Sequence, residues 1–216
     1  MKNLTINPVA VVTEKEMQGM LSGQVHPSGL QLGANEPWGV TLGCRIPKDY
    51  FETRGKGESD IAVHAGSYHL ALKDANIEKF NIMTYSSILP GIANKIEQPR
   101  DMVHGAVVES IMSTCTVSKG ERGTAGIIYG WLFNRKTNEK FGGLVCENYG
   151  DYSSGDLRKH LGLSIEELYV NGFEEDYELR DIHYLSETIV PVKKHGTALV
   201  SLCFTSYFHP IIKTNS

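Results

Sequence analysis

Two adjacent serines, Ser86 and Ser87, have the residue type and the setting for chemistry. They end an apolar, extended-looking run in "NIMTYSSILPG" and are followed at once by Ile88, Leu89 and Pro90. A polar turn that closes a strand is one interpretation, because serine is a common turn residue. A hydrolase nucleophile is another, but no GxSxG motif surrounds the pair and no spacing nominates a histidine and an aspartate as partners. The elements around the pair must decide between such interpretations.

Composition restricts the classes of protein to which the chain can belong. Its 216 residues are 41% hydrophobic and 21% charged, as in ordinary globular proteins that bury a full core. The net charge of -4 leaves no basic surface for nucleic acid or an anionic membrane. No apolar run approaches the roughly 20 residues of a membrane span, and the first residues are too often polar for a signal peptide. We therefore expect a cytoplasmic protein that binds neither nucleic acid nor membrane.

The cysteines and the early part of the chain add little chemistry. The four cysteines are far apart and form no CxxC pair, so we expect reduced thiols and no metal site. Residues 1–45 are rich in Gly, Pro, Asn and Ser without a sustained period, which predicts an irregular N-terminal arm. The remaining residues, 46–216, are predicted to form one domain.

Hydrophobic periodicity predicts helices in two places and a sheet of at least six strands. A helical stripe follows "TRGKGESD", with apolar residues at spacings of three and four: Ile61, Ala65, Tyr68, Leu72 and Ala75. Capping boxes at Ser153 and Ser164 predict one kinked helix or two short ones that end near Gly172. The predicted strands are "KFNIMTY", "HGAVVESIMS", "GTAGIIYGWLF", "FGGLVCE", "HYLSETIVPV" and "GTALVSLCFTSYF". Most are apolar on nearly every residue, which predicts a layered α+β domain with sheets covered on both faces.

Several of these segments, in order, resemble the pyruvoyl-dependent arginine decarboxylases. The segment "IEKFNIMTYSSILPG" resembles the self-cleavage segment of that family. "TRGKGESD" looks like its glycine-rich turn, "VHGAVVESIM" like the strand after cleavage, "GGLVCENYG" like the strand with its acid, and "KKHGTALVSLCF" like its last strand. The resemblance extends from about residue 46 to 209. It implies a four-layer αββα sandwich, and a homo-oligomer, either a trimer or a hexamer, with active sites between subunits.

The resemblance also assigns the chemistry of the serine pair. The Ser87 hydroxyl would attack the carbonyl of Ser86, and the chain would part between the two residues, leaving a pyruvoyl group at residue 87. Asn81 matches the asparagine thought to polarise the attacked carbonyl, as a neutral amide donor can. Glu147 lies where the family has the acid that returns a proton to the substrate, and burial would raise its pKa for that task. The implied reaction is L-arginine to agmatine and carbon dioxide, without a metal.

One residue departs from the family pattern. The helix before the cleavage strand carries an aspartate in the family, which pairs with the substrate guanidinium, and the matching residue here is His69. A neutral imidazole accepts one hydrogen bond, whereas a carboxylate accepts two parallel ones. Glu58 and Asp60 precede this helix and are the favoured replacements; Asp74 and Glu78 are also near. Two alternatives stay open: a decarboxylase of a different amino acid, or a non-catalytic oligomer of the same fold that is never cleaved.

Overall fold

The fold is that of a computed structural model that describes residues 44–209, and the predicted arm lies outside the described residues except for its last two. The boundary between arm and domain stays a prediction. The elements are, in chain order, β1 (Ile46–Pro47), β2 (Asp49–Ser59), the π-helical turn η1 (Val63–Tyr68), α2 (His69–Asp74), β3 (Asn81–Thr84), β4 (Ile88–Pro90), β5 (Asn94–Lys95), β6 (Val107–Ser118), β7 (Gly123–Asn134), β8 (Lys140–Gly150), α3 (Ser154–Gly172), β9 (Tyr177–Ile189), β10 (His195–Phe204) and β11 (Tyr207–Phe208). Over this part of the chain, no helix is both long and apolar enough to cross a membrane.

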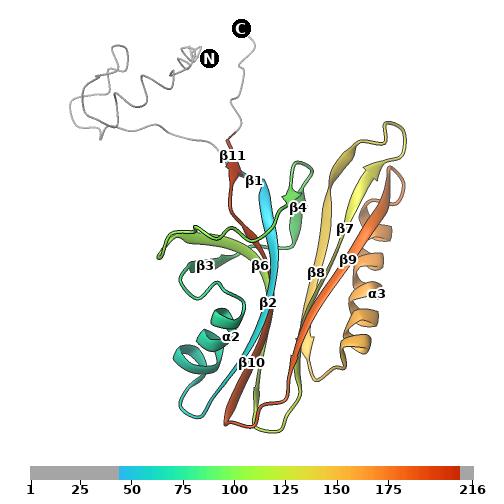
Figure 1. Cartoon of the computed structure of the whole chain (residues 1–216). Coiled ribbons are helices and arrows are strands. Elements are labelled where there is room, and N and C mark those ends of the chain that lie inside the picture. The colour runs from blue at the N-terminus through green and yellow to red at the C-terminus, as the bar shows by residue number, and fades with distance from the viewer. Residues whose placement is uncertain (1–43, 210–216) are drawn as a thin grey trace, which may run out of the picture. The chain divides into compact units, whose positions relative to one another are not determined.

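The strands form two larger sheets and one short pair. A five-stranded sheet has the order β3-β6-β10-β2-β5, a four-stranded sheet has the order β4-β8-β7-β9, and β1 pairs with β11. Figure 1 shows α2 beside the first sheet and α3 beside the second. The long strands pair antiparallel with their neighbours, whereas the short β3 and β5 pair in parallel with β6 and β2. The α+β class is confirmed.

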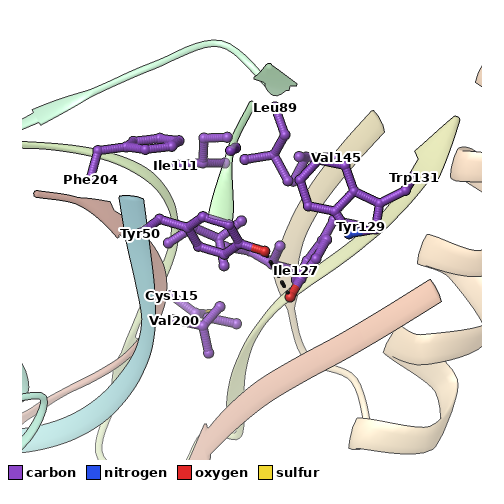
Figure 2. Close-up of a cluster of buried hydrophobic side chains, with 13 residues drawn as sticks. Tyr50, Leu89, Ile111, Cys115, Ile127, Tyr129, Trp131, Val145, Val200 and Phe204 are labelled. Carbon is purple, nitrogen blue, oxygen red and sulfur yellow. Dashed lines mark hydrogen bonds between the residues drawn. The ribbon is translucent and has the colours of Figure 1, made fainter. Parts of the chain in front are cut away.

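Three buried clusters hold these elements together. The largest joins side chains of β2, β6 and β10 in one sheet to side chains of β4, β7 and β8 in the other, as Figure 2 shows. A second cluster packs α2 on the five-stranded sheet, and a third packs α3 on the four-stranded sheet. Strand β7 is buried on almost every residue, as its continuous apolar run predicts for a sheet covered on both faces.

The first helical segment differs from its prediction in which side it buries. The apolar spacing predicts a continuous α-helix, but Val63–Tyr68 form a π-helical turn before α2 begins at His69. A π-turn takes more residues per turn than an α-helix, so a stripe counted at 3.6 residues no longer stays on one face. Ile61 lies before the π-helical turn begins and is 91% exposed, while Gly66 and Ser67 within the turn are buried.

The glycine-rich segment before that helix is a strand and not the expected turn. Gly55 and Gly57 lie inside β2, where α2 crosses them closely. A Cβ atom at Gly55 would meet the Ala71 carbonyl oxygen at 2.3 Å, so the helix can approach the strand only because the side chain is absent. The prediction failed because glycines that allow close packing and glycines that allow a turn look alike in a sequence.

The second helical segment is one helix, α3. Ser153 caps it, because its hydroxyl oxygen accepts a hydrogen bond from the Asp156 amide at 3.1 Å. The second predicted cap is wrong: Ser164 lies inside the helix and donates to the His160 carbonyl. The buried stripe of Leu157, Leu161 and Ile165 continues past Gly162, and packing of that stripe on the sheet overrides the local stop signal.

Candidate active site

Ser86 and Ser87 lie where the chain passes from one sheet to the other. Strand β3 is an edge strand of the five-stranded sheet, and β4 is an edge strand of the four-stranded sheet. The link between them is short, and it contains both serines. Ser86 is exposed and Ser87 is half-buried. The peptide bond between the serines therefore belongs to neither sheet. Breaking it would remove no hydrogen bond between paired strands in either sheet.

The structure brings Ser87 and Glu147 together. The Ser87 hydroxyl oxygen lies 2.6 Å from both carboxylate oxygens of Glu147, and it can donate its single hydrogen to either. Glu147 is near the end of β8, two residues after Val145, so strand alternation places both on the face that meets the other sheet. The Val145 amide also donates to the Ser87 carbonyl at 3.3 Å. Ser87 and Glu147 are sixty residues apart in the sequence, and the pairing of β4 with β8 brings them together.

Glu147 is not buried as the sequence analysis expected. Its side chain is exposed in the single chain, although the three residues before it are buried. The apolar run ends at Cys146, and the link between β3 and β4 covers the carboxylate from one side only, through Ser87. Any burial of this carboxylate must therefore come from something that covers this rim of the two sheets.

Asn81 does not reach the serine pair in its own chain. It is the first residue of β3, and its amide nitrogen donates to the Gly105 carbonyl at 2.8 Å. A strand rises roughly 3.3 Å per residue, so Asn81 and Thr84 are already about 10 Å apart, and Ser86 lies farther on. Within one described chain, this amide fixes the loop that leads into β6. Its assigned role on the Ser86 carbonyl stays a prediction.

The three residues expected to bind substrate are engaged elsewhere or free. His69 begins α2 and is exposed. Glu58 accepts hydrogen bonds from the amides of Val192 and Lys193, and Asp60 accepts one from the next amide along that turn. Through these hydrogen bonds, both carboxylates stabilise the turn between β9 and β10.

Register places Glu58 far from the serines of its own chain. The Tyr85 amide donates to the carbonyl of Ser110, which is level with Cys203 and, across β10, with Phe51. Glu58 is seven residues farther along β2, roughly 23 Å at 3.3 Å per residue. Substrate binding by Glu58 or Asp60 within one chain would need contacts that this fold does not provide, so these assignments stay predictions.

A buried carboxylate beside the serine pair was not predicted from the sequence. Glu109 on β6 is 4% exposed, and its two oxygens accept from the Arg45 guanidinium and from the Tyr85 hydroxyl. Burial works to raise the pKa of Glu109, but the nearby hydroxyl groups of Tyr207 and Tyr85 and the Arg45 guanidinium together outweigh it and lower that pKa. The available signal was a single acid inside an otherwise apolar run, "HGAVVESIM".

Comparisons with known proteins agree on one family. Residues 49–209 match the family model described as pyruvoyl-dependent arginine decarboxylase. A protein of Chlamydia trachomatis serovar L2 named pyruvoyl-dependent arginine decarboxylase AaxB is 30% identical over 190 residues, which cover 78% of this chain and 95% of the relative. Proteins named pyruvoyl-dependent arginine decarboxylase from Methanocella arvoryzae and Methanococcoides burtonii are 33% and 38% identical, over 58% and 56% of this chain and 74% and 73% of the relatives. The matched range agrees with the segments that carried the resemblance.

Proposed function

Because the chain belongs to the pyruvoyl-dependent arginine decarboxylase family, we propose that it cleaves itself between Ser86 and Ser87 and then decarboxylates L-arginine to agmatine. The observation that carries this proposal is the contact of the Ser87 hydroxyl with both oxygens of Glu147 at 2.6 Å, in a link that belongs to neither sheet. A nucleophile, a carboxylate that orients it by hydrogen bonding and a dispensable peptide bond thus meet at one point. No metal is part of the proposal.

Self-cleavage uses atoms of the chain itself. The Ser87 hydroxyl oxygen attacks the Ser86 carbonyl carbon, the C–N bond between the residues breaks, and the Ser87 nitrogen takes a proton, so an ester replaces the amide. β-Elimination then removes the α-proton of residue 87 and breaks its Cβ–Oγ bond, which leaves a carboxylate on Ser86 and a dehydroalanine at residue 87. One water hydrolyses this residue, ammonia leaves, and a pyruvoyl group begins the second chain. Correct placement of hydroxyl and carbonyl supplies roughly 7 to 11 kcal/mol of the barrier.

In turnover, the Glu147 carboxyl group has a second proposed role, as the proton donor to the substrate. The pyruvoyl group supplies a carbonyl that withdraws electrons from the amino acid as carbon dioxide leaves. Glu147, already within hydrogen-bond reach of residue 87, is placed to give the substrate α-carbon the proton that replaces the lost carboxylate. General acid catalysis of this kind contributes roughly 10² to 10⁴ in rate. Leu89, fully buried two residues after Ser87, would hold the new chain end near Glu147.

A homo-oligomer, a trimer or a hexamer, would complete the site. Glu147 and Ile88 are exposed in the single chain, Ile88 to 69%, and Asn81 does not reach its own Ser86. A second protomer over this rim would bury the carboxylate and could present its Asn81 to the Ser86 carbonyl. Mixing Asn81→Ala with Ser87→Ala precursors tests this: cleavage restored to the Asn81→Ala chains in mixed oligomers supports it. Absence of any restoration in oligomers of proven mixed composition would contradict it.

The intact mass of the purified protein tests the proposed cleavage. We expect a chain of residues 1–86 and a chain that starts at residue 87, resists Edman sequencing and has the mass of a pyruvoyl cap. Ser87→Ala should stay one chain and lack activity. Ser86→Ala is the matched control and should still be cleaved, because only the backbone of Ser86 takes part. A full-length wild-type species that persists on long incubation would contradict the proposal.

Substrate choice is tested separately, because His69 stands where the family has an aspartate. Initial rates on arginine, lysine, ornithine, histidine and aspartate, before and after His69→Asp, decide it. If arginine is the substrate, wild type prefers it and His69→Asp changes its KM only modestly. If wild type ignores arginine and His69→Asp creates activity on it, the enzyme acts on a different amino acid and His69 excludes the guanidinium.

A further inference from the structure

The Glu109 carboxylate connects three distant parts of the chain. Glu109 lies on β6, Arg45 lies just before β1, and Tyr85 follows β3; the sequence distances from Glu109 are 64 and 24 residues. The Arg45 guanidinium also lies 4.8 Å over the ring of Tyr207 on β11. A charge buried this deeply is stable only with such partners, because removing one partner leaves it uncompensated. The network therefore holds these three segments of the chain in fixed positions relative to one another.

Tyr85 is the residue immediately before the cleavage pair, and it is held at three places. Its amide donates to the Ser110 carbonyl at 2.8 Å, its hydroxyl donates to Glu109, and its ring packs on Phe204 with centroids 5.6 Å apart. The next residue, Ser86, is exposed, and its carbonyl accepts only the Ile88 amide at 3.0 Å among the described residues. The carbonyl under attack thus has its fixed anchor on the upstream side at Tyr85.

We propose that Arg45, Glu109 and Tyr85 act as one positioning unit for self-cleavage, which holds the Ser86 carbonyl in line with the Ser87 hydroxyl. This inference rests on the proposed function, since it has meaning only if the chain is cleaved. Glu147 orients the hydroxyl from the four-stranded sheet, and Glu109 orients the carbonyl from the five-stranded sheet. A charged hydrogen bond is the stronger kind and fixes its donor more tightly than a neutral one does. None of the three residues touches the reacting atoms, so they are positioning residues.

The expected effect follows from the sensitivity of an intramolecular attack to geometry. Misplacement of reacting groups by about 1 Å slows a reaction about 100-fold. Tyr85→Phe removes the hydroxyl and keeps the ring on Phe204, so the segment loses one anchor and retains its packing. We expect this change to slow cleavage roughly 10- to 100-fold.

The experiment follows cleavage of freshly synthesised precursor on denaturing gels over time. Tyr85→Phe, Glu109→Gln and the double variant are compared with Tyr68→Phe, a matched control whose hydroxyl contacts only a methionine sulfur at 4.0 Å among the described residues. Because the three residues form one unit, the double variant should be no slower than the slower single variant. Two residues that acted independently would instead make the two effects multiply. If Glu109→Gln does not fold, Arg45→Gln replaces it in the comparison.

The outcomes separate this inference from the proposed function. If Tyr85→Phe is cleaved as fast as wild type, or if the effects multiply in the double variant, the proposed positioning unit is overturned and the proposed function stays intact. An uncleaved wild type would overturn both. Slow cleavage in Tyr85→Phe with normal cleavage in Tyr68→Phe, and no further slowing in the double variant, is the result that supports it.

Discussion

Glu147→Gln separates the making of the pyruvoyl group from its use. Gln has nearly the shape of Glu and still accepts a hydrogen bond, so the contact of residue 147 with the Ser87 hydroxyl at 2.6 Å can persist. Gln cannot give up a proton. We therefore expect the variant to cleave itself and then to turn over poorly.

The two effects differ in size. A hydrogen bond to a charged group contributes about 1.5 to 3 kcal/mol and one to a neutral group about 0.5 to 1.5, so the swap weakens this contact by about 1 kcal/mol. At 1.36 kcal/mol for each tenfold change, cleavage should slow about fivefold. Loss of the general acid should lower turnover by roughly 10² to 10⁴, or about 2.7 to 5.4 kcal/mol of barrier.

The assay counts active sites before it measures rates. Intact mass spectrometry gives the fraction of chains cut after Ser86, and carbon dioxide release is then expressed per cut chain. Glu139→Gln is the matched control, because Glu139 is an exposed acid just before the same strand and bonds only to Thr137 and Asn134 among the described residues. Wild-type turnover per cut chain in Glu147→Gln would refute the proton-donor role. Failure to cleave would show that Glu147 must take the Ser87 proton during processing.

Three further predictions concern stability and reactivity. In the Ser87→Ala background, which we expect to stay one chain, Leu89→Ala should lower the free energy of unfolding by about 2 to 5 kcal/mol, measured by urea denaturation, because it empties a fully buried site between the sheets. The folded-state pKa of Glu109 is lowered, so its contribution to stability is present above the unfolded pKa of about 4.3 and is lost as pH falls through the folded value. The melting difference between this background and its Glu109→Gln variant should therefore shrink as pH falls below about 4. Burial raises the pKa of the Cys203 thiol to about 12, so a thiol reagent at pH 8 should modify exposed Cys44 quickly and Cys203 only after denaturation, as peptide mapping would show.

The sequence nominated Ser86, Ser87 and Glu147 because their signals are local, and their assigned roles stay predictions. Ser86 and Ser87 lie within one short motif, and Glu147 lies at the end of a recognisable apolar strand, so order along the chain sufficed. The contact between Ser87 and Glu147 is a consequence of β4 pairing with β8, which the sequence analysis did not predict because β4 has only three residues. A strand that short has no period to detect.

Residues whose roles depend on contacts distant in sequence were not predictable. Glu109 reads as a polar interruption of a strand, and only the fold shows that Arg45 and Tyr85 surround it. For Glu58, closeness in sequence to His69 suggested a shared site, whereas β2 carries Glu58 to the turn before β10 in the described chain, and its assigned role stays a prediction. Charge and proximity along the chain nominate partners, but strand register decides them.

The position of the proposed cut would reconcile two requirements that otherwise conflict. A pyruvoyl group must be a chain terminus, and termini are usually poorly held. Here the residues on both sides of the cut keep their own anchors: Tyr85 is bonded to β6, and the Ser87 carbonyl accepts the Val145 amide of β8. Leu89, fully buried two residues later, fixes β4 in the layer between the sheets. Because the proposed cut falls between edge strands of different sheets, cleavage would free the new end to react and leave it held on the framework that carries Glu147.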